Sequence, residues 1–486
     1  MADIHWLPWS AVPFARARAS RRPVLLSIVT GWSLACRAMD ETSYADPAVV
    51  ALVNERFIPV RVDADRRPDI SERYSLGGWP TTAFLTADGT LVGGGTFVPR
   101  ERFAPVLSRA ADTVAARGDT LAVEARRAAS PLPPAMVPEM AASDDEIYRA
   151  VLATFDQVHG GFGGAPKFPL VAPIRLMLQR QQDQPDEAAL HAATLSLDAI
   201  GWSGLYDDVA GGFHRCASDD GWREPQREKL LEVNAGLIDV YVEAAHQLGV
   251  QRYADRARDA LTYVQNWLAD PVDGGWAGFE LARSTRELET PGAITPQVDR
   301  TLFSGWNGTM ISTALHLAHA FEDDVLGRFA LTALERVLAL CYRPGQGVSR
   351  CAEVRGPSGI FLDDQFAVAA ACLDAHDATG NIVYEMMAQE LALHAMRALW
   401  SPDGGGFLDR IAGEGAEAIG RLADPLVPFV ANCDAAAVLH RLALTTSKPE
   451  FAGTADAVLA AMAPRAIGHG PAAAHYLLAR RAARAR

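Results

Sequence analysis

The stretch that decides the fold is Thr30-Gly31-Trp32-Ser33-Leu34-Ala35-Cys36-Arg37-Ala38-Met39. An apolar run over 23–29 precedes it and predicts a buried strand, and a helical pattern follows it. A cysteine in the first turn of a helix that follows a strand is typical of a thiol redox site, where the helix N-terminus stabilises a thiolate. A dithiol site needs a second cysteine three residues earlier, and that position holds Ser33. The stretch therefore indicates a redox-type fold whose dithiol chemistry is lost.

The elements around this stretch follow a definite order. The sequence predicts a helix over 10–20, a strand over 23–29, a helix over 33–54 that breaks near 46–47, and a strand over 57–62. After Trp79-Pro80 it predicts a strand to Leu85, a turn at Asp88-Gly89, a strand over 90–92 and a helix over 101–116. This order resembles the thioredoxin fold, whose cis-proline loop faces the redox site and matches Trp79-Pro80-Thr81. We therefore expect a cis Trp79–Pro80 bond close to Cys36.

Longer motifs match a narrower family. The chain contains Cys36-Arg37-Ala38-Met39, Asn54-Glu55-Arg56-Phe57, Val62-Asp63 with Pro68-Asp69, and Gly78-Trp79-Pro80. These motifs resemble the thioredoxin-like domain of the spermatogenesis-associated protein 20 group, also called the DUF255 family. Members of that family carry Cys-His-Trp-Cys-His-x-Met at the redox position. This chain departs from that motif at Ser33 and Arg37.

A change of composition marks the end of the first domain. Residues 128–143 are rich in proline and alanine, which is typical of a linker. We therefore expect an α/β thioredoxin-like domain over 1–127, a linker over 128–143 and a second domain over 144–486.

The second domain is helical and repetitive. Helix-period apolar patterns predict about twelve helices, over 145–157, 171–181, 187–200, 228–248, 251–268, 304–321, 326–342, 362–380, 382–399, 433–446, 450–463 and 471–485. Glycine-rich turns recur between them, often followed by an aromatic residue, as at 160–162, 211–213, 274–276 and 404–407. Two helices per repeat predict helical hairpins, about six of which can close as an (α/α)6 toroid. An open α-solenoid is the alternative, and the Gly-Gly-aromatic turns favour the toroid.

The family resemblance extends into this domain. The chain reproduces the family's motifs at 160–169, at 208–215 and at Trp306-Asn307-Gly308. The family's Pro-His-Phe-Glu-Lys-Met-Leu appears as residues 225–231, in which Gln226 and Arg227 replace the histidine and the phenylalanine. The resemblance implies a six-hairpin, glycosidase-like toroid related in shape to the sugar 2-epimerases.

Composition limits the classes of function. The chain has 486 residues and a net charge of −14, which argues against a nucleic-acid binder or an anionic-membrane binder. No apolar run reaches the roughly 18–20 residues of a membrane span. The cysteines at 36, 216, 341, 351, 372 and 433 show no metal-ligand spacing, and their scatter fits a reduced, cytoplasmic protein. We predict no metal site and no cofactor.

Cys36 is the redox candidate, and two interpretations of it remain open. Alone it can form a mixed disulfide or be oxidised, but it cannot release itself through a second thiol. The alternative is a retained structural cysteine, with Ser33 as a helix N-cap. Between these lies a surface formed by Ser33, Trp79 and Pro80 that binds a peptide or thiol partner without redox turnover.

The loops of the toroid supply the other candidates, because toroids of this type often bind sugars in the central cavity. The candidates are Asp207, Asp208, His214, Arg215, Glu224, Glu228, Lys229, Asp299, Trp306, Asn307, Asp363, Asp364, Asn432 and Asp434. Glycoside hydrolysis needs two carboxylates about 5–10 Å apart, and Glu228 with Asp363 or Asp208 is the candidate pair. Sugar isomerisation needs a base, for which His214 is the candidate.

Within that set, the catalytic candidates are Asp208, His214, Glu228 and Asp363, and the binding candidates are Arg215, Lys229, Trp306 and Asn307. We expect the motif residues to surround one cavity that takes a small, carbohydrate-like ligand. Each also has a structural explanation, since the motif residues can tie a Gly-Gly turn to a helix or cap a helix start. A carbohydrate-type protein, a thiol redox protein and a non-catalytic scaffold therefore all remain open.

Overall fold

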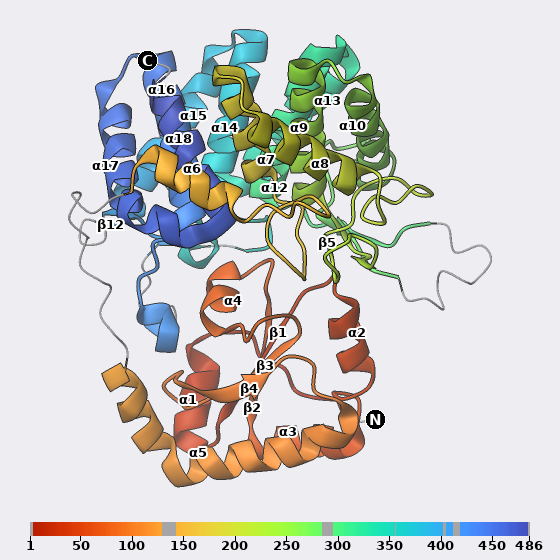
Figure 1. Cartoon of the computed structure of the whole chain (residues 1–486). Coiled ribbons are helices and arrows are strands. Elements are labelled where there is room, and N and C mark those ends of the chain that lie inside the picture. Colours follow the sequence, from red (N-terminus) through yellow and green to blue (C-terminus); the bar gives the residue numbers. More distant parts are fainter. Residues whose placement is uncertain are drawn as a thin grey trace. The chain divides into compact units, whose positions relative to one another are not determined.

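The computed structural model describes residues 3–128, 142–283, 295–354, 356–401, 405–411 and 418–484. The chain divides into two compact units. The N-terminal unit comprises Met1–Pro133, Pro357–Gly359 and Arg410–Leu426, and the C-terminal unit comprises the remainder (Figure 1). The sequence analysis assigned the segment Arg410–Leu426 to the second domain, whereas its contacts group it with the first.

The N-terminal unit is built on a four-stranded sheet in the order β2-β1-β3-β4. The strands are β1 (Val24–Val29), β2 (Ile58–Asp63), β3 (Thr81–Leu85) and β4 (Leu91–Gly95). β1 pairs parallel to β2 and antiparallel to β3, and β3 pairs antiparallel to β4. The central strand β1 is buried along nearly its whole length, as its continuous apolar run predicts. The predicted β-α-β unit with a following hairpin is confirmed.

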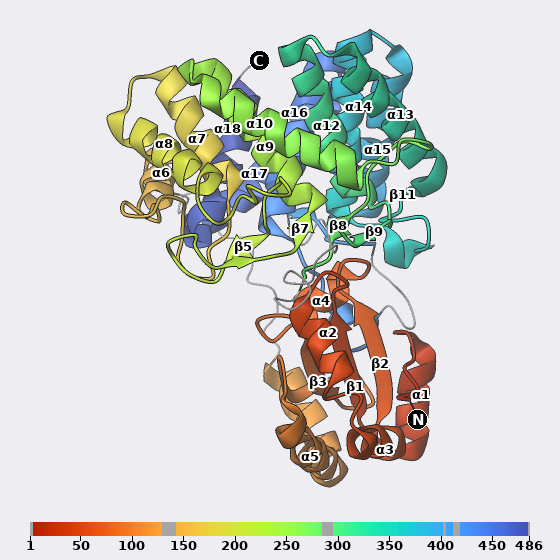
Figure 2. The same ribbon diagram turned by 90° about the vertical axis from the view of Figure 1, so that its right-hand side faces the viewer.

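Helices cover this sheet (Figure 2). They are α1 (Ala11–Ser20), α2 (Leu34–Glu41), α3 (Pro47–Arg56), α4 (Pro68–Tyr74) and α5 (Arg100–Ala128). The predicted break between α2 and α3 is present, because the Asp46 side chain caps α3 and Pro47 occupies its first turn. The sequence analysis missed α4, which has only seven residues.

The segment Arg410–Leu426, here called the inserted segment, completes the core of this unit. Its 3-10 turn η5 (Gly420–Ala423) places Leu422 in one cluster with Trp9, Phe14 and Tyr74. The Tyr74 hydroxyl donates to the Gly89 carbonyl at 2.8 Å and accepts from the backbone N–H of Arg421 at 2.9 Å. This single hydroxyl therefore joins α4, the β3–β4 turn and the inserted segment.

A closed ring of helices forms the centre of the C-terminal unit. Among the described residues, six inner helices pack in the order α7-α9-α12-α14-α16-α18, and α18 packs back on α7. They are α7 (Val171–Asp183), α9 (Leu231–Leu248), α12 (Ser304–Phe321), α14 (Leu362–Thr379), α16 (Phe429–Thr446) and α18 (Ala473–Arg484). The predicted (α/α)6 toroid is confirmed, and the open solenoid is not observed.

An outer helix packs on each inner helix. The outer helices are α6 (Asp144–Leu152), α8 (Glu187–Gly201), α10 (Gln251–Tyr263), α13 (Asp324–Cys341), α15 (Ile382–Ala398) and α17 (Pro449–Ala466). The sixth pair joins the two ends of the domain, because α18 packs on α6. Arg480 and Arg484 of α18 bind Asp144 of α6, and Arg481 binds Asp183 of α7. The basic C-terminal residues thus help to close the ring.

Short strands connect the helices at the end of the ring where the inner helices begin. They are β5 (Cys216–Ala217), β6 (Pro225–Gln226), β7 (Lys229–Leu230), β8 (Phe279–Glu280), β9 (Val298–Asp299), β10 (Tyr342–Arg343), β11 (Gly347–Val348), β12 (Trp400–Ser401) and β13 (Gly406–Phe407). The π-helix η2 (Val264–Leu268) extends α10, and the 3-10 turns η3 (Pro357–Gly359) and η6 (Ile467–Ala472) complete the described elements. The sequence analysis missed these strands, because two-residue strands carry no periodic signal.

Candidate functional site

The thioredoxin-type position is built around the start of α2. The Ser33 side chain caps the helix by accepting the backbone N–H of Cys36 at 3.3 Å. The Cys36 side chain is buried, with 4% of the residue exposed. Burial raises the pKa of the Cys36 thiol, although hydrogen bonds with Thr30 and Ser33 act in the opposite direction. The structure thus holds Cys36 as a buried neutral thiol, and a reactive thiolate is disfavoured.

The loop before β3 carries the predicted proline. The Trp79–Pro80 bond is cis, as expected. The Trp79 ring lies edge-on to the Trp32 ring with centroids 5.4 Å apart, and its Nε1–H donates to Ser71 Oγ at 3.3 Å. Because Trp32 precedes α2, this contact brings the loop to the turn that carries the Ser33–Cys36 motif.

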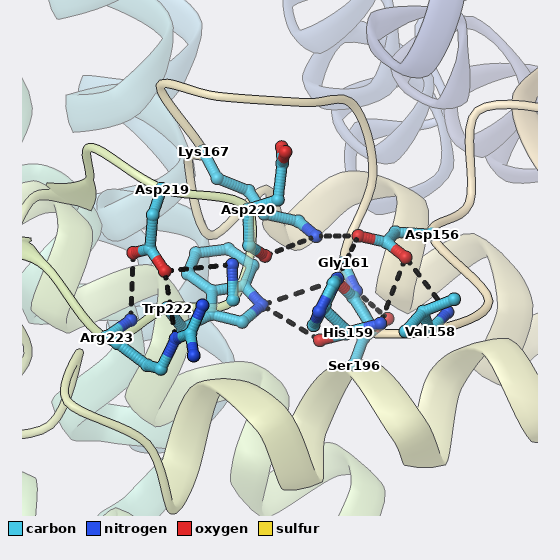
Figure 3. A network of polar contacts seen from close by, with 12 residues as sticks. Asp156, Val158, His159, Gly161, Lys167, Ser196, Asp219, Asp220, Trp222 and Arg223 are labelled. Carbon is cyan, nitrogen blue, oxygen red and sulfur yellow. Dashed lines mark hydrogen bonds and ion pairs between the residues drawn. The ribbon is translucent and has the colours of Figure 1, made fainter.

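The Gly-Gly-aromatic turns of the toroid share one construction. Asp156, Asp207 and Asp270 each begin an Asp-x-Val-x-Gly-Gly-aromatic turn. One carboxylate oxygen of each aspartate accepts the backbone N–H groups two and three residues later, at 2.9–3.2 Å. Both glycines of each turn have φ between +68° and +81°, a region that residues with a Cβ avoid. Figure 3 shows the first of these turns, around Asp156.

A long cationic side chain fills each turn. Lys167 binds Asp156 at 2.5 Å, Lys229 binds Asp207 at 2.8 Å, and Arg336 binds Asp270 at 2.9 Å. Lys229 is buried, and its ammonium group also donates to the Gly211 carbonyl at 2.7 Å. The Asp207 carboxyl loses solvation, but Lys229 and backbone N–H groups lower its pKa to about 2. Lys229, a binding candidate from the sequence, is therefore occupied in holding a turn.

In four repeats an amide side chain clamps the residue that directly follows a glycine. The clamps are Asn234, Asn307, Gln365 and Asn432, each the fourth residue of its inner helix. Each accepts the backbone N–H and donates to the backbone C=O of one residue, which is Phe213, Trp276, Val348 or Phe407 respectively. The structure therefore places the candidates Asn307 and Asn432 among buried backbone groups. An amide at the fourth position of successive inner helices is the sequence signal that could have identified this role.

The motif at 225–231 is also largely internal. Glu228 is buried and accepts Arg215 Nε at 2.6 Å. His214 is buried as well, and burial together with the positive charge of Lys229 lowers its pKa to about 4. Asp208 is exposed and lies 3.7 Å from Arg256 of the outer helix α10. Among the described contacts, Glu228, His214 and Asp208 have different partners, and none of the three is paired with Trp306.

Three other candidates are likewise exposed or held by partners of their own. Glu224 is exposed, Asp299 accepts the backbone N–H of Thr301 at 2.8 Å, and Asp434 accepts from His475 at 2.7 Å. Asp363, Asp364 and Trp306 remain. These three lie at one place.

Arg350 brings these three together at the start of the inner helices α12 and α14. Its Nη1 lies 3.2 Å from a carboxylate oxygen of both Asp363 and Asp364. Its guanidinium carbon is 5.8 Å from the centroid of the Trp306 ring. Asp364 is fully buried and also accepts the backbone N–H of Gly305 at 3.1 Å, whereas the Asp363 side chain is 57% exposed. We call Arg350, Asp363, Asp364 and Trp306, with Glu232 described next, the Arg350 cluster.

Glu232, the second residue of α9, belongs to this cluster and was missed from the sequence. Its side chain is reached by solvent, but crowding by protein atoms desolvates the carboxyl, and the negative charge of Asp363 adds to this effect. Together they raise the pKa of Glu232 to about 7, against the opposing charge of Arg350. Burial also raises the pKa of Asp364 to about 7. Two carboxyl groups poised near neutral pH beside one arginine are typical of a proton-transfer site.

A second charged network lies deeper along the inner helices. Arg175, Asp239, His316, Asp374 and Arg441 form a continuous chain of ion pairs from α7 to α16. Desolvation opposes the charged imidazole of His316, but hydrogen bonds with Asp239 and Asp374 raise its pKa to about 10. His316 is therefore an imidazolium ion at neutral pH and cannot act as a base. The cations and anions of this network alternate along the chain of pairs, and it was not predicted from the sequence, since its members lie on five helices.

Among the described residues, no group of three His, Cys, Asp or Glu side chains is arranged to hold a metal ion. No helix in this part of the chain is long and apolar enough to cross a bilayer.

Comparison with known protein families identifies the first unit. Residues 1–130 match the family Thioredox_DsbH, described as a protein of unknown function, DUF255. These residues are a DUF255 domain. The DUF255 domain thus includes the whole of the sheet and the Ser33–Cys36 position.

Relatives extend the similarity beyond this domain. Spermatogenesis-associated protein 20 of Mus musculus is 30% identical over 311 residues, which cover 58% of this chain and 39% of the mouse protein. The human protein of that name is 29% identical over the same length. A thiol:disulfide interchange protein DsbD of Ralstonia nicotianae is 33% identical over 112 residues, or 21% of this chain. The chain thus matches about two fifths of the length of the mouse protein.

Solved structures share the toroid. The cellobiose 2-epimerase of Spirochaeta thermophila aligns with a TM-score of 0.52 and 15% identity, covering 65% of this chain and 81% of the epimerase. A GH76 α-mannanase of Bacteroides thetaiotaomicron aligns with a TM-score of 0.51 and 11% identity, covering 70% of this chain and 95% of the mannanase. At these identities the similarity shows the fold alone, and it agrees with the six helix pairs seen here.

Proposed function

We propose that the toroid binds a small, carbohydrate-class ligand at the Arg350 cluster, with Glu232 as the group that exchanges a proton with it. The observation that carries this proposal is the environment of Glu232, whose side chain is reached by solvent while crowding around its carboxyl raises the pKa to about 7. A group with this pKa is present in both protonation states at neutral pH, so it can both donate and accept a proton. The sugar-converting proteins among the solved toroids support the choice of ligand class.

The rest of the cluster suits a polyhydroxylated ligand. Asp363 presents an exposed carboxylate that can accept hydrogen bonds from hydroxyl groups, and Arg350 fixes the position of this carboxylate. Trp306 and Phe303 are both buried and pack their rings beside the same arginine, with their centroids 4.5 Å apart, so they support Arg350 from within. Glu228, which the sequence favoured as half of a hydrolytic pair, is held by Arg215, so we assign proton exchange to Glu232.

Sugar binding should depend on Glu232 and on pH. A panel of monosaccharides and disaccharides, screened by thermal shift and calorimetry, should contain at least one sugar that binds saturably. We expect this sugar to bind at least about tenfold more weakly to Glu232→Gln, because the substitution removes a hydrogen bond to a charged group. Ionised Glu232 is the better acceptor, so wild-type affinity should rise as pH increases through about 7, and the variant should lose this rise.

The matched control is Glu450→Gln, since Glu450 is also the exposed second residue of a helix but lies on the outer helix α17. It should leave binding and its pH profile unchanged. A panel without any saturable sugar, or binding that is indifferent to Glu232→Gln, would overturn the proposal.

For the thioredoxin-like unit we propose that the surface around Ser33 and Cys36 does not catalyse dithiol–disulfide exchange. The buried Cys36 has a raised pKa, and Ser33 stands where a second thiol is needed. The protein should therefore not accelerate the reduction of insulin disulfides by dithiothreitol, measured by turbidity beside a dithiol thioredoxin. Turnover by the wild-type protein that disappears in Cys36→Ser would contradict this proposal.

A further inference from the structure

A cavity of about 730 Å³ lies in the N-terminal unit, away from the Ser33–Cys36 position. It is bordered by the end of α1, the β3–β4 turn and the middle of α5. Its charged lining residues are Arg18, Arg21, Arg22, Asp88 and Arg117. Its volume falls in the range of about 300–1,000 Å³ that is usual for small-molecule sites. Neither the family match nor the proposed toroid site accounts for it.

The arginines on the α1 side of this cavity have no ion pair with a carboxylate among the described residues. Arg22 donates to the backbone carbonyls of Asn54 and Glu55 at 3.0 Å and to the Ser20 hydroxyl at 3.2 Å. In the part of the chain that the structure describes, neither Arg18 nor Arg21 has an ion-pair partner. Among the described residues, three guanidinium groups therefore face one cavity without an ion-pair partner of their own, and Asp88 is the acidic residue of its lining.

The acidic residue of the lining is already engaged. The Asp88 carboxylate accepts the Thr86 hydroxyl and, at 3.4 Å, the backbone N–H of Thr90. Arg117 adds a further guanidinium from α5. The cavity therefore has an excess of positive charge in a chain whose net charge is −14.

This excess contrasts with three arginines of the toroid. Arg175 and Arg441 each bind two carboxylates, and Arg350 binds Asp363 and Asp364. Like charges that gather without partners repel one another, and an anion between them relieves the repulsion. Guanidinium groups favour phosphate oxygens, which they can bind through two parallel hydrogen bonds.

We propose that this cavity binds a small phosphorylated molecule from solution, with Arg18 and Arg21 contacting its phosphate groups and Arg22 holding the α1 side of the site. Arg18 closes the last turn of α1, and Arg21 follows with φ +55° as the helix C-cap. Because Arg22 is fixed on the carbonyls that end α3, the cation at the base of the site is already placed. The phosphate is the recognised group, and the rest of the molecule lies in the cavity.

The experiment measures binding of inorganic pyrophosphate and tripolyphosphate to the full chain by calorimetry. We expect saturable binding that the double variant Arg18→Gln/Arg21→Gln weakens at least about tenfold, because each lost guanidinium removes a charge-assisted hydrogen bond. The matched control is Arg16→Gln, since Arg16 is an exposed arginine of the same helix that lies outside the cavity lining. It removes one charge from α1 and should leave the affinity within about twofold of wild type.

Three results would overturn the proposal. One is the absence of saturable binding of both probes. Another is equal weakening by Arg16→Gln, which would indicate general charge attraction. The third is binding to phosphatidylcholine vesicles that contain phosphatidic acid without binding to either soluble probe, which would make a lipid headgroup the ligand.

Discussion

Substituting Asp69→Ala is expected to destabilise the thioredoxin-like unit by about 3–5 kcal/mol, the usual effect of removing one partner from a buried ion pair. The Asp69 side chain is fully buried and receives both arms of Arg67 at 2.9 Å. Arg410 Nε, from the inserted segment, lies 3.5 Å from the same carboxylate. Removing the carboxylate leaves two poorly solvated guanidinium groups beside each other. Hydrogen exchange of the amides in β1 and β3 measures this stability separately from that of the toroid.

The effect should extend to the inserted segment. Besides binding Asp69, Arg410 donates to the Leu422 carbonyl at 2.6 Å, so it links the buried carboxylate to the residue that enters the core. Gly420 has φ +57°, and a Cβ there would lie 2.3 Å from the Tyr74 hydroxyl oxygen, so this segment fits its site closely. We therefore expect the backbone N–H of Arg421 to exchange faster in Asp69→Ala.

A matched control separates burial from charge. Asp112 pairs with Arg56 at 2.7 Å in the same unit, but its side chain is 69% exposed. Asp112→Ala should change stability by less than about 1 kcal/mol, since exposed ion pairs contribute little. Equal effects of the two substitutions would contradict the role assigned to Asp69.

Asp69 also shows how far the sequence could be interpreted. The Pro68-Asp69 pair was recognised as part of a family motif, but the partner in the inserted segment lies 341 positions later in the chain. Apolar runs and turn residues predict strands and helices because those signals are local, and the sheet and the helical hairpins followed from them. A contact between distant loops has no periodic signal, and so the sequence did not indicate that the inserted segment groups with the N-terminal unit.

The candidate site shows the same limit. Polar residues in strong motifs were expected to bind a ligand, yet several of them hold the Gly-Gly turns, as Lys229 and Asn307 do. Asp363 and Trp306 were predicted and do lie together, but Arg350, which brings them together, has no motif around it. Glu232 follows a recognised motif by one residue and resembles an ordinary acidic residue in the first turn of a helix. Its raised pKa arises from crowding by other segments, which the sequence does not show.

Substituting Asn307→Ala, which removes one of the clamp side chains, is expected to destabilise the toroid by about 3 kcal/mol. The buried Asn307 amide accepts the Trp276 N–H at 2.8 Å and donates to the Trp276 and Phe303 carbonyls, both at 3.0 Å. Alanine removes this partner from the buried N–H and C=O of Trp276, whereas the Phe303 carbonyl keeps the backbone N–H of residue 307, and each unpaired buried group costs about 1–3 kcal/mol. Urea denaturation, with hydrogen exchange at Trp276, measures the loss.

The control for this substitution is Asn381→Ala, because Asn381 is an exposed helix N-cap that accepts one N–H, from Val383 at 3.1 Å. It should cost about 1 kcal/mol. The comparison also decides between the two roles that the sequence left open for Asn307. A clamp predicts lost stability and faster exchange at Trp276, whereas a ligand-binding residue predicts unchanged stability and lost sugar binding. Because the side chain is fully buried and all its described hydrogen bonds are with the backbone, we expect the first result.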